Sequence, residues 1–101
     1  MIRHIVFFSA KDPADAQRIR DALREKLGPI PHHRHFEAHL NAKHDSFGNQ
    51  IDVVVYAEFD SRADLEAYPK HPLYAESVEL VRPMRELRFA ADYETDEEAA
   101  A

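Results

Sequence analysis

The chain has 101 residues, with 13 Lys or Arg, 19 Asp or Glu and a formal net charge of −6. Four of the acids lie in the last eight residues, so the remainder is nearly neutral and lacks the basic patch that a nucleic-acid-binding protein requires. The chain has no cysteine, no run of about 18 apolar residues and no charged-then-apolar leader, so we expect a single cytoplasmic domain without disulfides, thiolate metal ligands or a membrane partner.

The first predicted element is a strand over residues 2–10. At a period of two residues, one face carries His4, Val6 and Phe8 and the other carries Ile5 and Phe7. Both faces are apolar, so the strand is predicted to lie in the middle of a sheet.

A helix follows, with Asp12 as its N-cap, Pro13 at its first position and Gly28 at its end. Apolar residues recur in it at spacings of three and four, which predicts a buried stripe of Ala16, Ile19, Leu23 and Leu27. The charged residues between them are expected to face solvent.

Residues 33–42 are predicted as a strand near a sheet edge, because only one of its faces is apolar. The apolar face, expected in the core, carries Phe36, Ala38 and Leu40. On the polar face, His35, Glu37 and His39 have an H-x-E-x-H spacing that could recruit a divalent metal. Three ligands along one strand span roughly 13 to 14 Å, so we favour a solvated edge or the rim of a dimer and predict no metal site.

A polar loop over residues 43–50 leads into a strand over residues 51–59, which is predicted to be central. One face is wholly apolar and consists of Ile51, Val53, Val55, Ala57 and Phe59. The other face carries Val54 and Tyr56 in mid-strand, so a cover is expected on this side too.

Ser61 and Asp64 form a capping-box pattern that predicts a helix ended by Pro69 and Pro72. A second helical piece follows, with Tyr74, Val78 and Val81 on one side and Pro83 at its end. The last strand is predicted over residues 84–93, with Leu87, Phe89 and Ala91 alternating with charged or small residues. Residues 94–101 are predicted to be an acidic, disordered tail outside the domain of residues 1–93.

The order strand, helix, strand, strand, helix, strand predicts an α+β, ferredoxin-like protomer: a four-stranded antiparallel sheet with its helices on one face. Two helices cannot cover both faces of such a sheet. The opposite face would carry Ile5, Phe7, Val54 and Tyr56, and burying each side chain would contribute about 1.5–3 kcal/mol. A homodimer in which two sheets pack face to face, a dimeric α/β barrel, is therefore expected.

Several segments together resemble the stress-responsive A/B barrel (Dabb) domain family of the dimeric α/β barrel superfamily: RHIVFF, LGPIP, VVVYAEF, SRADLEAYPKHP, VRP and the final DY. The resemblance implies the same protomer and the same homodimer. One plant member closes a polyketide by aldol condensation, and its pocket residues correspond to His4, Tyr68 and His71. Its catalytic base corresponds to Tyr74, a phenol with an ordinary pKa of about 10, so the resemblance does not carry that reaction over.

His4, Tyr68, His71 and Tyr74 are the candidate ligand-binding residues, and no catalytic residue or cofactor motif stands out. Alternatively, His71 caps the helical piece after Pro72 and the tyrosines are packed in the core. The leading interpretation is a homodimer that binds a small hydrophobic molecule or has a structural role. The alternative is a cyclase, isomerase or monooxygenase-like enzyme acting on a polyketide-like or other hydrophobic molecule. A cavity of roughly 300 Å³ or more would favour a binder or enzyme, and a filled core a structural protein.

Overall fold

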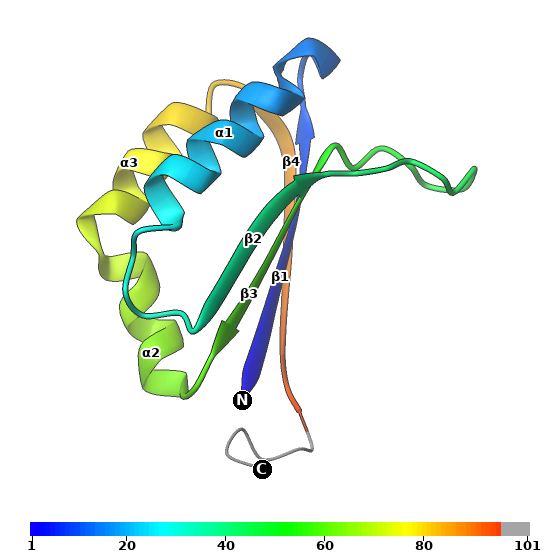
Figure 1. Ribbon diagram of the computed structural model, residues 1–101. Coiled ribbons are helices and arrows are strands. Elements are labelled where there is room, and N and C mark those ends of the chain that lie inside the picture. Colours follow the sequence, from blue (N-terminus) through cyan, green and yellow to red (C-terminus); the bar gives the residue numbers. More distant parts are fainter. Residues whose placement is uncertain (96–101) are drawn as a thin grey trace.

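The computed structural model describes residues 1–95, which form a four-stranded antiparallel sheet with the helices on one side (Figure 1). The strands are β1 (Ile2–Ala10), β2 (His35–Leu40), β3 (Val53–Phe59) and β4 (Arg85–Glu94), in the spatial order β2-β3-β1-β4. The predicted ferredoxin-like fold is confirmed. β1 and β3 are central, as expected from their two apolar faces.

The helical layer contains α1 (Ala16–Leu27), α2 (Arg62–Ala67) and α3 (Pro72–Val81). A 3₁₀ turn, η1 (Pro13–Asp15), precedes α1, and a second, η2 (Tyr68–Lys70), joins α2 to α3. The second helix is thus broken where the prolines predicted a break, because a proline supplies no N–H for the helical ladder.

Local sequence signals account for the helix ends. The Asp12 carboxylate accepts a hydrogen bond from the backbone N–H two residues on (3.0 Å), and the Ser61 hydroxyl accepts one from the N–H three residues on (3.2 Å). Gly28 follows α1 with φ −55°, so positive φ does not explain the glycine. A Cβ at Gly28 would lie 2.6 Å from the carbonyl oxygen of Arg24, so this close approach favours glycine.

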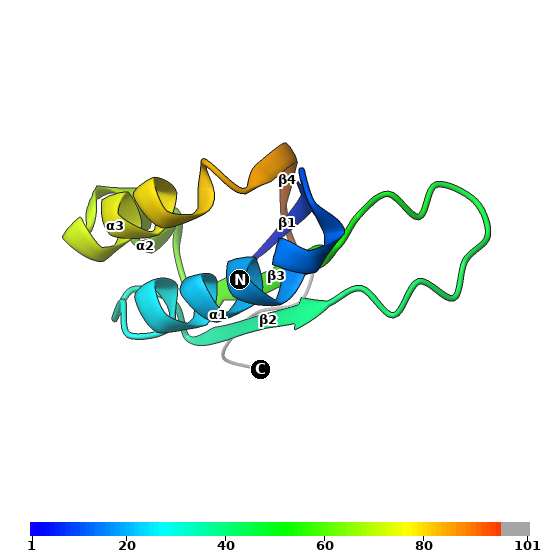
Figure 2. The same cartoon turned by 90° about the horizontal axis from the view of Figure 1, so that it is seen from above.

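The core lies between α1 and the sheet, and it contains the predicted stripe of α1 together with the inward face of β3. Leu40 is an exception, because its side chain is 43% exposed although it was predicted to be buried. It is the last residue of the edge strand, next to the point where the chain leaves the sheet for the loop before β3. In Figure 2 that loop extends beyond the sheet, and Phe47 on it is 84% exposed.

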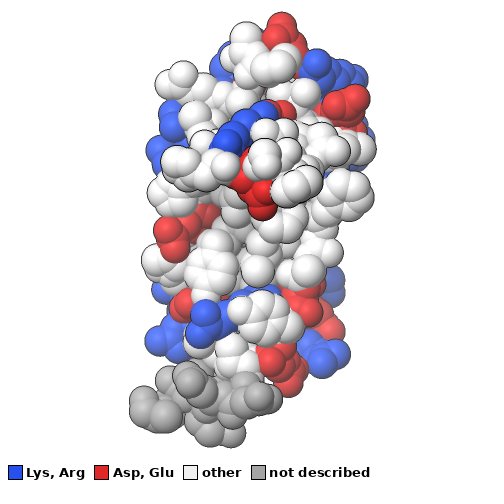
Figure 3. All heavy atoms as spheres, turned by 90° about the vertical axis from the view of Figure 1, so that its right-hand side faces the viewer, with Lys and Arg blue, Asp and Glu red and all other residues white. Residues whose placement is uncertain are grey.

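The sheet face without helices carries uncharged side chains over much of its area (Figure 3). As predicted, it carries Ile5, Phe7, Val54 and Tyr56, and the strand register adds Leu87, Phe89, Ala91 and Tyr93 from β4. Phe7 lies between Val54 and Phe89 in one cross-strand row, and Phe89 is 56% exposed. We call these eight residues the open face.

At the C-terminal end, β4 continues to Glu94, one residue beyond the predicted strand, and the backbone N–H of Thr95 donates to the carbonyl of Met1 (3.0 Å). The rest of the predicted acidic tail, residues 96–101, lies outside the described residues. None of the helices formed by residues 1–95 is long and apolar enough to cross a membrane.

Candidate functional site

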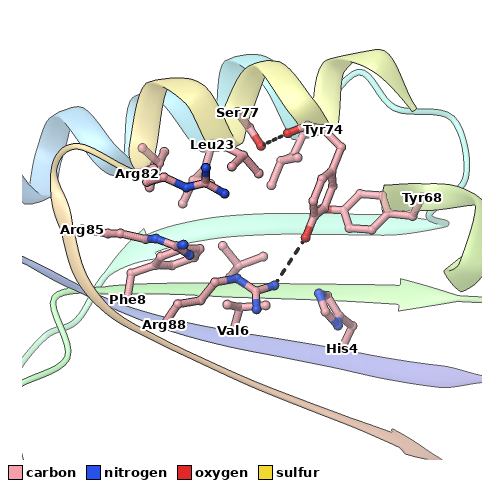
Figure 4. A pocket seen from close by; sticks show the side chains of 14 residues that line it. His4, Val6, Phe8, Leu23, Tyr68, Tyr74, Ser77, Arg82, Arg85 and Arg88 are labelled. Atoms are coloured by element: carbon pink, nitrogen blue, oxygen red, sulfur yellow. Dashed lines mark hydrogen bonds between the residues drawn. The ribbon is translucent and has the colours of Figure 1, made fainter. Parts of the chain in front are cut away.

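A cleft lies between α3 and the sheet, because α3 packs mainly on α1 and stands away from the strands (Figure 4). Its apolar walls comprise Val6, Leu23, Leu27, Val55, Val78 and Val81. The side chains leave about 30 Å³ free between them, room for about one water molecule. The whole hollow, including its part open to solvent, measures about 430 Å³. The free room is well below the roughly 300 Å³ that would by itself favour a binder or an enzyme. A molecule larger than water therefore enters only if side chains at the mouth of the cleft move.

His4 and Asp92 form a pair at one side of this cleft. The two residues are opposite each other on β1 and β4, and the His4 Nδ1 lies 2.5 Å from a carboxylate oxygen of Asp92. Because a carboxylate only accepts hydrogen bonds, Nδ1 carries the proton and Nε2 of a neutral His4 ring carries a lone pair. An imidazole held in this way has the arrangement of a general base.

Tyr68 is the most deeply buried polar side chain of the site, with 2% of its surface exposed. Its ring packs edge-to-face on His4 (centroids 6.0 Å apart) and on Tyr74 (5.3 Å). Burial, reinforced by the nearby Tyr74, raises the pKa of the Tyr68 hydroxyl far above its usual range. The hydroxyl therefore stays protonated and is a potential donor. Within residues 1–95 it makes no hydrogen bond.

Tyr74 lies at the mouth of the cleft, on the first turn of α3. Its hydroxyl accepts a long hydrogen bond (3.4 Å) from the guanidinium of Arg88, and its backbone carbonyl accepts one (2.7 Å) from the hydroxyl of Ser77. The Tyr74–Arg88 contact crosses the cleft from α3 to β4 (Figure 4). Movement of these two side chains would therefore open the cleft.

Three of the four candidate ligand residues thus come together: His4, Tyr68 and Tyr74 all line the cleft. His71 is not among the lining residues. Its Nδ1 accepts a hydrogen bond (3.1 Å) from the backbone N–H of Leu73 and caps α3, which was the alternative drawn from the sequence. Whether any of the four binds a ligand stays a prediction.

Sequence reasoning missed Asp92 and the arginines of the cleft, Arg82, Arg85 and Arg88. The alternation along β4 does place Arg88 and Asp92 on one face. However, only the register with β1 shows that this charged face is turned toward the helices and that Asp92 reaches His4.

The His35, Glu37 and His39 row lies elsewhere, on the helix-free side of the edge strand. Both imidazole rings donate from Nε2 to the Glu37 carboxylate, at 2.8 and 3.0 Å, and these hydrogen bonds hold the pKa of Glu37 below its ordinary value. The ring nitrogens that face Glu37 are therefore already engaged. Within residues 1–95 no group of three or more His, Cys, Asp or Glu side chains is arranged to hold a metal ion.

The family model of the stress-responsive A/B barrel (Dabb) domain matches residues 2–95, nearly the whole chain. The chain belongs to this family. No curated protein is a significant match to the A/B barrel sequence.

Solved structures share the fold of the chain. A dimeric ferredoxin-like protein of unknown function from Thermobifida fusca is 26% identical, with a TM-score of 0.78, over 91% of this A/B barrel chain and 88% of its own. A dimeric protein of unknown function from Bacteroides fragilis is 25% identical, with a TM-score of 0.76, over 93% of this chain and 95% of its own. A Nitrosomonas europaea protein with a suggested antibiotic biosynthesis monooxygenase role is 20% identical, with a TM-score of 0.78, over 96% of this chain and 100% of its own. At this identity the similarity shows that the two proteins share a fold and nothing about activity.

Proposed function

We propose that two copies of this A/B barrel chain associate through the open face and that each copy binds a small, largely hydrophobic molecule in its cleft. Exposed aromatic side chains on a sheet support the association, since a monomer gains nothing from leaving them in water. Arg3 gives a second reason to expect association, because its Nε is buried on the same side of the sheet and has no hydrogen-bond partner within residues 1–95. A second sheet can supply an acceptor. The two relatives of at least 25% identity described above are dimeric.

The observation that carries the ligand proposal is the hydroxyl of Tyr68, which makes no hydrogen bond within residues 1–95. It is not one of the fully buried polar atoms without a partner, so it borders the open space of the cleft, where a water molecule or the acceptor atom of a ligand can reach it. A molecule with an apolar body and one acceptor atom would satisfy this donor while it covers the apolar walls of the cleft.

Methyl-labelled protein and a set of small aromatic alcohols and ketones provide the test. We expect NMR shift changes confined to the methyl groups of Leu23, Leu27, Val55 and Val78, and weaker binding by Tyr68→Phe. Tyr56→Phe is the matched control, because Tyr56 lies on the open face and its hydroxyl is already bonded to Glu58. If no compound in the set perturbs the cleft methyls at millimolar concentration, the cleft is a filled core and the proposal is wrong.

The His4–Asp92 pair favours a second candidate function, an enzyme that removes a proton from a carbon next to a carbonyl. In this scheme the Nε2 of His4 takes the proton and the Tyr68 hydroxyl donates to the developing enolate oxygen. The assay is the exchange of α-protons of a soluble β-diketone with D₂O, followed by NMR. We expect His4→Gln and Asp92→Asn to lower any exchange above background by about 10²-fold or more. Exchange that both variants retain would exclude this pair as the base.

A further inference from the structure

Three arginines line the cleft without an acidic partner. Arg82 follows α3, while Arg85 and Arg88 belong to β4, and all three extend toward the same space (Figure 4). Within residues 1–95 none of them forms an ion pair. Four of the six other arginines in the described part of the chain have acidic partners: Arg18, Arg20, Arg34 and Arg62. Of the remaining two, Arg24 donates to the backbone carbonyl of Ala38, and the Nε of Arg3 has no partner among residues 1–95.

Among residues 1–95, none of those that line this cleft is an acid. Asp92, which lies opposite His4 on β4, is already hydrogen-bonded to the His4 ring. Arg88 makes only the long contact with the uncharged Tyr74 hydroxyl. Arg82 and Arg88 are exposed and Arg85 is half-buried, so the three positive charges lie on the solvent-accessible part of the cleft lining, where an anion would be attracted to all of them.

The polar groups of the cleft are separated along its length. In Figure 4, Arg82 and Arg85 lie at one end, His4 and Tyr68 at the other, and Arg88 between them. The Asp92 carboxylate at the His4 end repels an anion, so the charged end of a ligand is directed to the arginines. Guanidinium groups match the paired oxygens of carboxylates and phosphates.

We propose that the cleft selects amphipathic oxyanions, small molecules with an apolar body and one carboxylate or phosphate group. The oxyanion lies against Arg82, Arg85 and Arg88, the body lies on the apolar walls, and entry separates Arg88 from Tyr74. This proposal rests on the ligand-binding function proposed above and adds the charge that the ligand carries.

The test compares matched probes by NMR titration of the cleft methyl groups: phenylacetate, its neutral analogue phenylacetamide, and phenyl phosphate. We expect at least one of the two anions to bind about tenfold or more tightly than the amide, since a hydrogen bond to a charged group is typically worth that factor. The preference should shrink as salt is raised. The tighter of the two anions identifies the headgroup.

Arg82→Met and Arg88→Met are the test variants, because methionine keeps much of the apolar stem and removes the charge. Each should reduce the anion preference several-fold and leave amide binding nearly unchanged. Arg18→Met is the control, since this arginine is exposed on the outside of α1 and pairs with Asp15. Having two variants at separate positions allows a result even if one of them fails to fold.

The outcomes distinguish the anion selectivity of the cleft from its more general ability to bind a ligand. Equal binding of anions and amide, or an anion preference that Arg18→Met reduces as much as the cleft variants do, would overturn the anion selectivity and leave a hydrophobic ligand site standing. Failure of all three probes to perturb the cleft methyl groups would overturn both.

Discussion

Phe89→Ala is the substitution that most directly tests the association of two open faces. Phe89 is 56% exposed and lies beside Phe7 in the row that continues to Val54. In a symmetric dimer each substitution occurs twice in the interface. The change removes a large apolar group without adding a charge, so its effect reports on burial.

The magnitude follows from the exposed area. An aromatic side chain covers roughly 200 Å², so 56% exposure leaves about 110 Å², which is worth about 3 kcal/mol at 25 cal/mol per Å². With one Phe89 in each copy, the dimer would then lose about 6 kcal/mol of favourable apolar burial. Ordering costs reduce what appears as affinity, and we take about half of this value, which corresponds to roughly a 100-fold increase in the dimer Kd.

Sedimentation over a protein concentration range of about 0.1 to 100 µM measures this change, with a dimer expected for the unaltered protein at micromolar concentration. Phe47→Ala is the matched control, because Phe47 is 84% exposed but lies on the loop before β3. As a surface change, Phe89→Ala should alter monomer stability by only about 0.5 kcal/mol. A clean monomer for the unaltered protein, or equal weakening by both alanine variants, would refute the reasoning.

Further substitutions test the interface, a buried carboxylate, the cleft and the phenol. Val54→Asp should weaken association by several kcal/mol in the same sedimentation assay, because it buries an unpaired charge between the sheets. Asp52→Ala removes the carboxylate that accepts a hydrogen bond from a backbone N–H of β1 (2.8 Å), and it should lower the melting temperature by about 4–8 °C for each kcal/mol of stability lost. Asp60→Ala should change the melting temperature little, because Asp60 is exposed. The unaltered protein should show no polyketide cyclisation, because Tyr74 occupies the position of the base, and measurable cyclisation by it would contradict this. If the cleft admits the substrate, Tyr74→His should add about 10²–10⁴-fold in a polyketide cyclisation or enolisation assay. The raised pKa of Tyr68 means that its contribution to stability is present below about pH 10, the pKa of an unfolded phenol, and is lost as pH rises above it. In urea unfolding, the free energy of unfolding should therefore fall more between pH 9 and pH 11 for the unaltered protein than for Tyr68→Phe.

Local patterns in the sequence determined the protomer. The alternation of Val53, Val55, Ala57 and Phe59 set the inward face of a central strand, and it is buried as expected. Asp12 and Ser61 set the starts of helical segments, because capping needs only a side-chain oxygen and the N–H groups of the next residues. Such interactions span a few residues and are therefore readable from neighbouring positions alone.

The open face was also predictable in part, because Ile5, Phe7, Val54 and Tyr56 lie on central strands with two apolar faces. The contribution of β4 was not. Its alternation alone would place Phe89 inward, as the more apolar side usually faces the core. In the structure Phe89 is on the open face and Arg88 is directed to the cleft, since the cleft lies over this edge of the sheet.

The sequence named three residues of the candidate site, His4, Tyr68 and Tyr74, and tertiary structure decided the rest of it. His4 and Asp92 are 88 residues apart, and they meet only because β1 and β4 pair in one particular register. The role of His71 as a helix cap and the exposure of Leu40 likewise depend on a side-chain rotamer and on the end of an edge strand. The free room in the cleft, about 30 Å³, depends on how far α3 stands from the sheet. Residue spacing gives the direction of a side chain from its own element, but distances between elements arise from the packing of the whole domain.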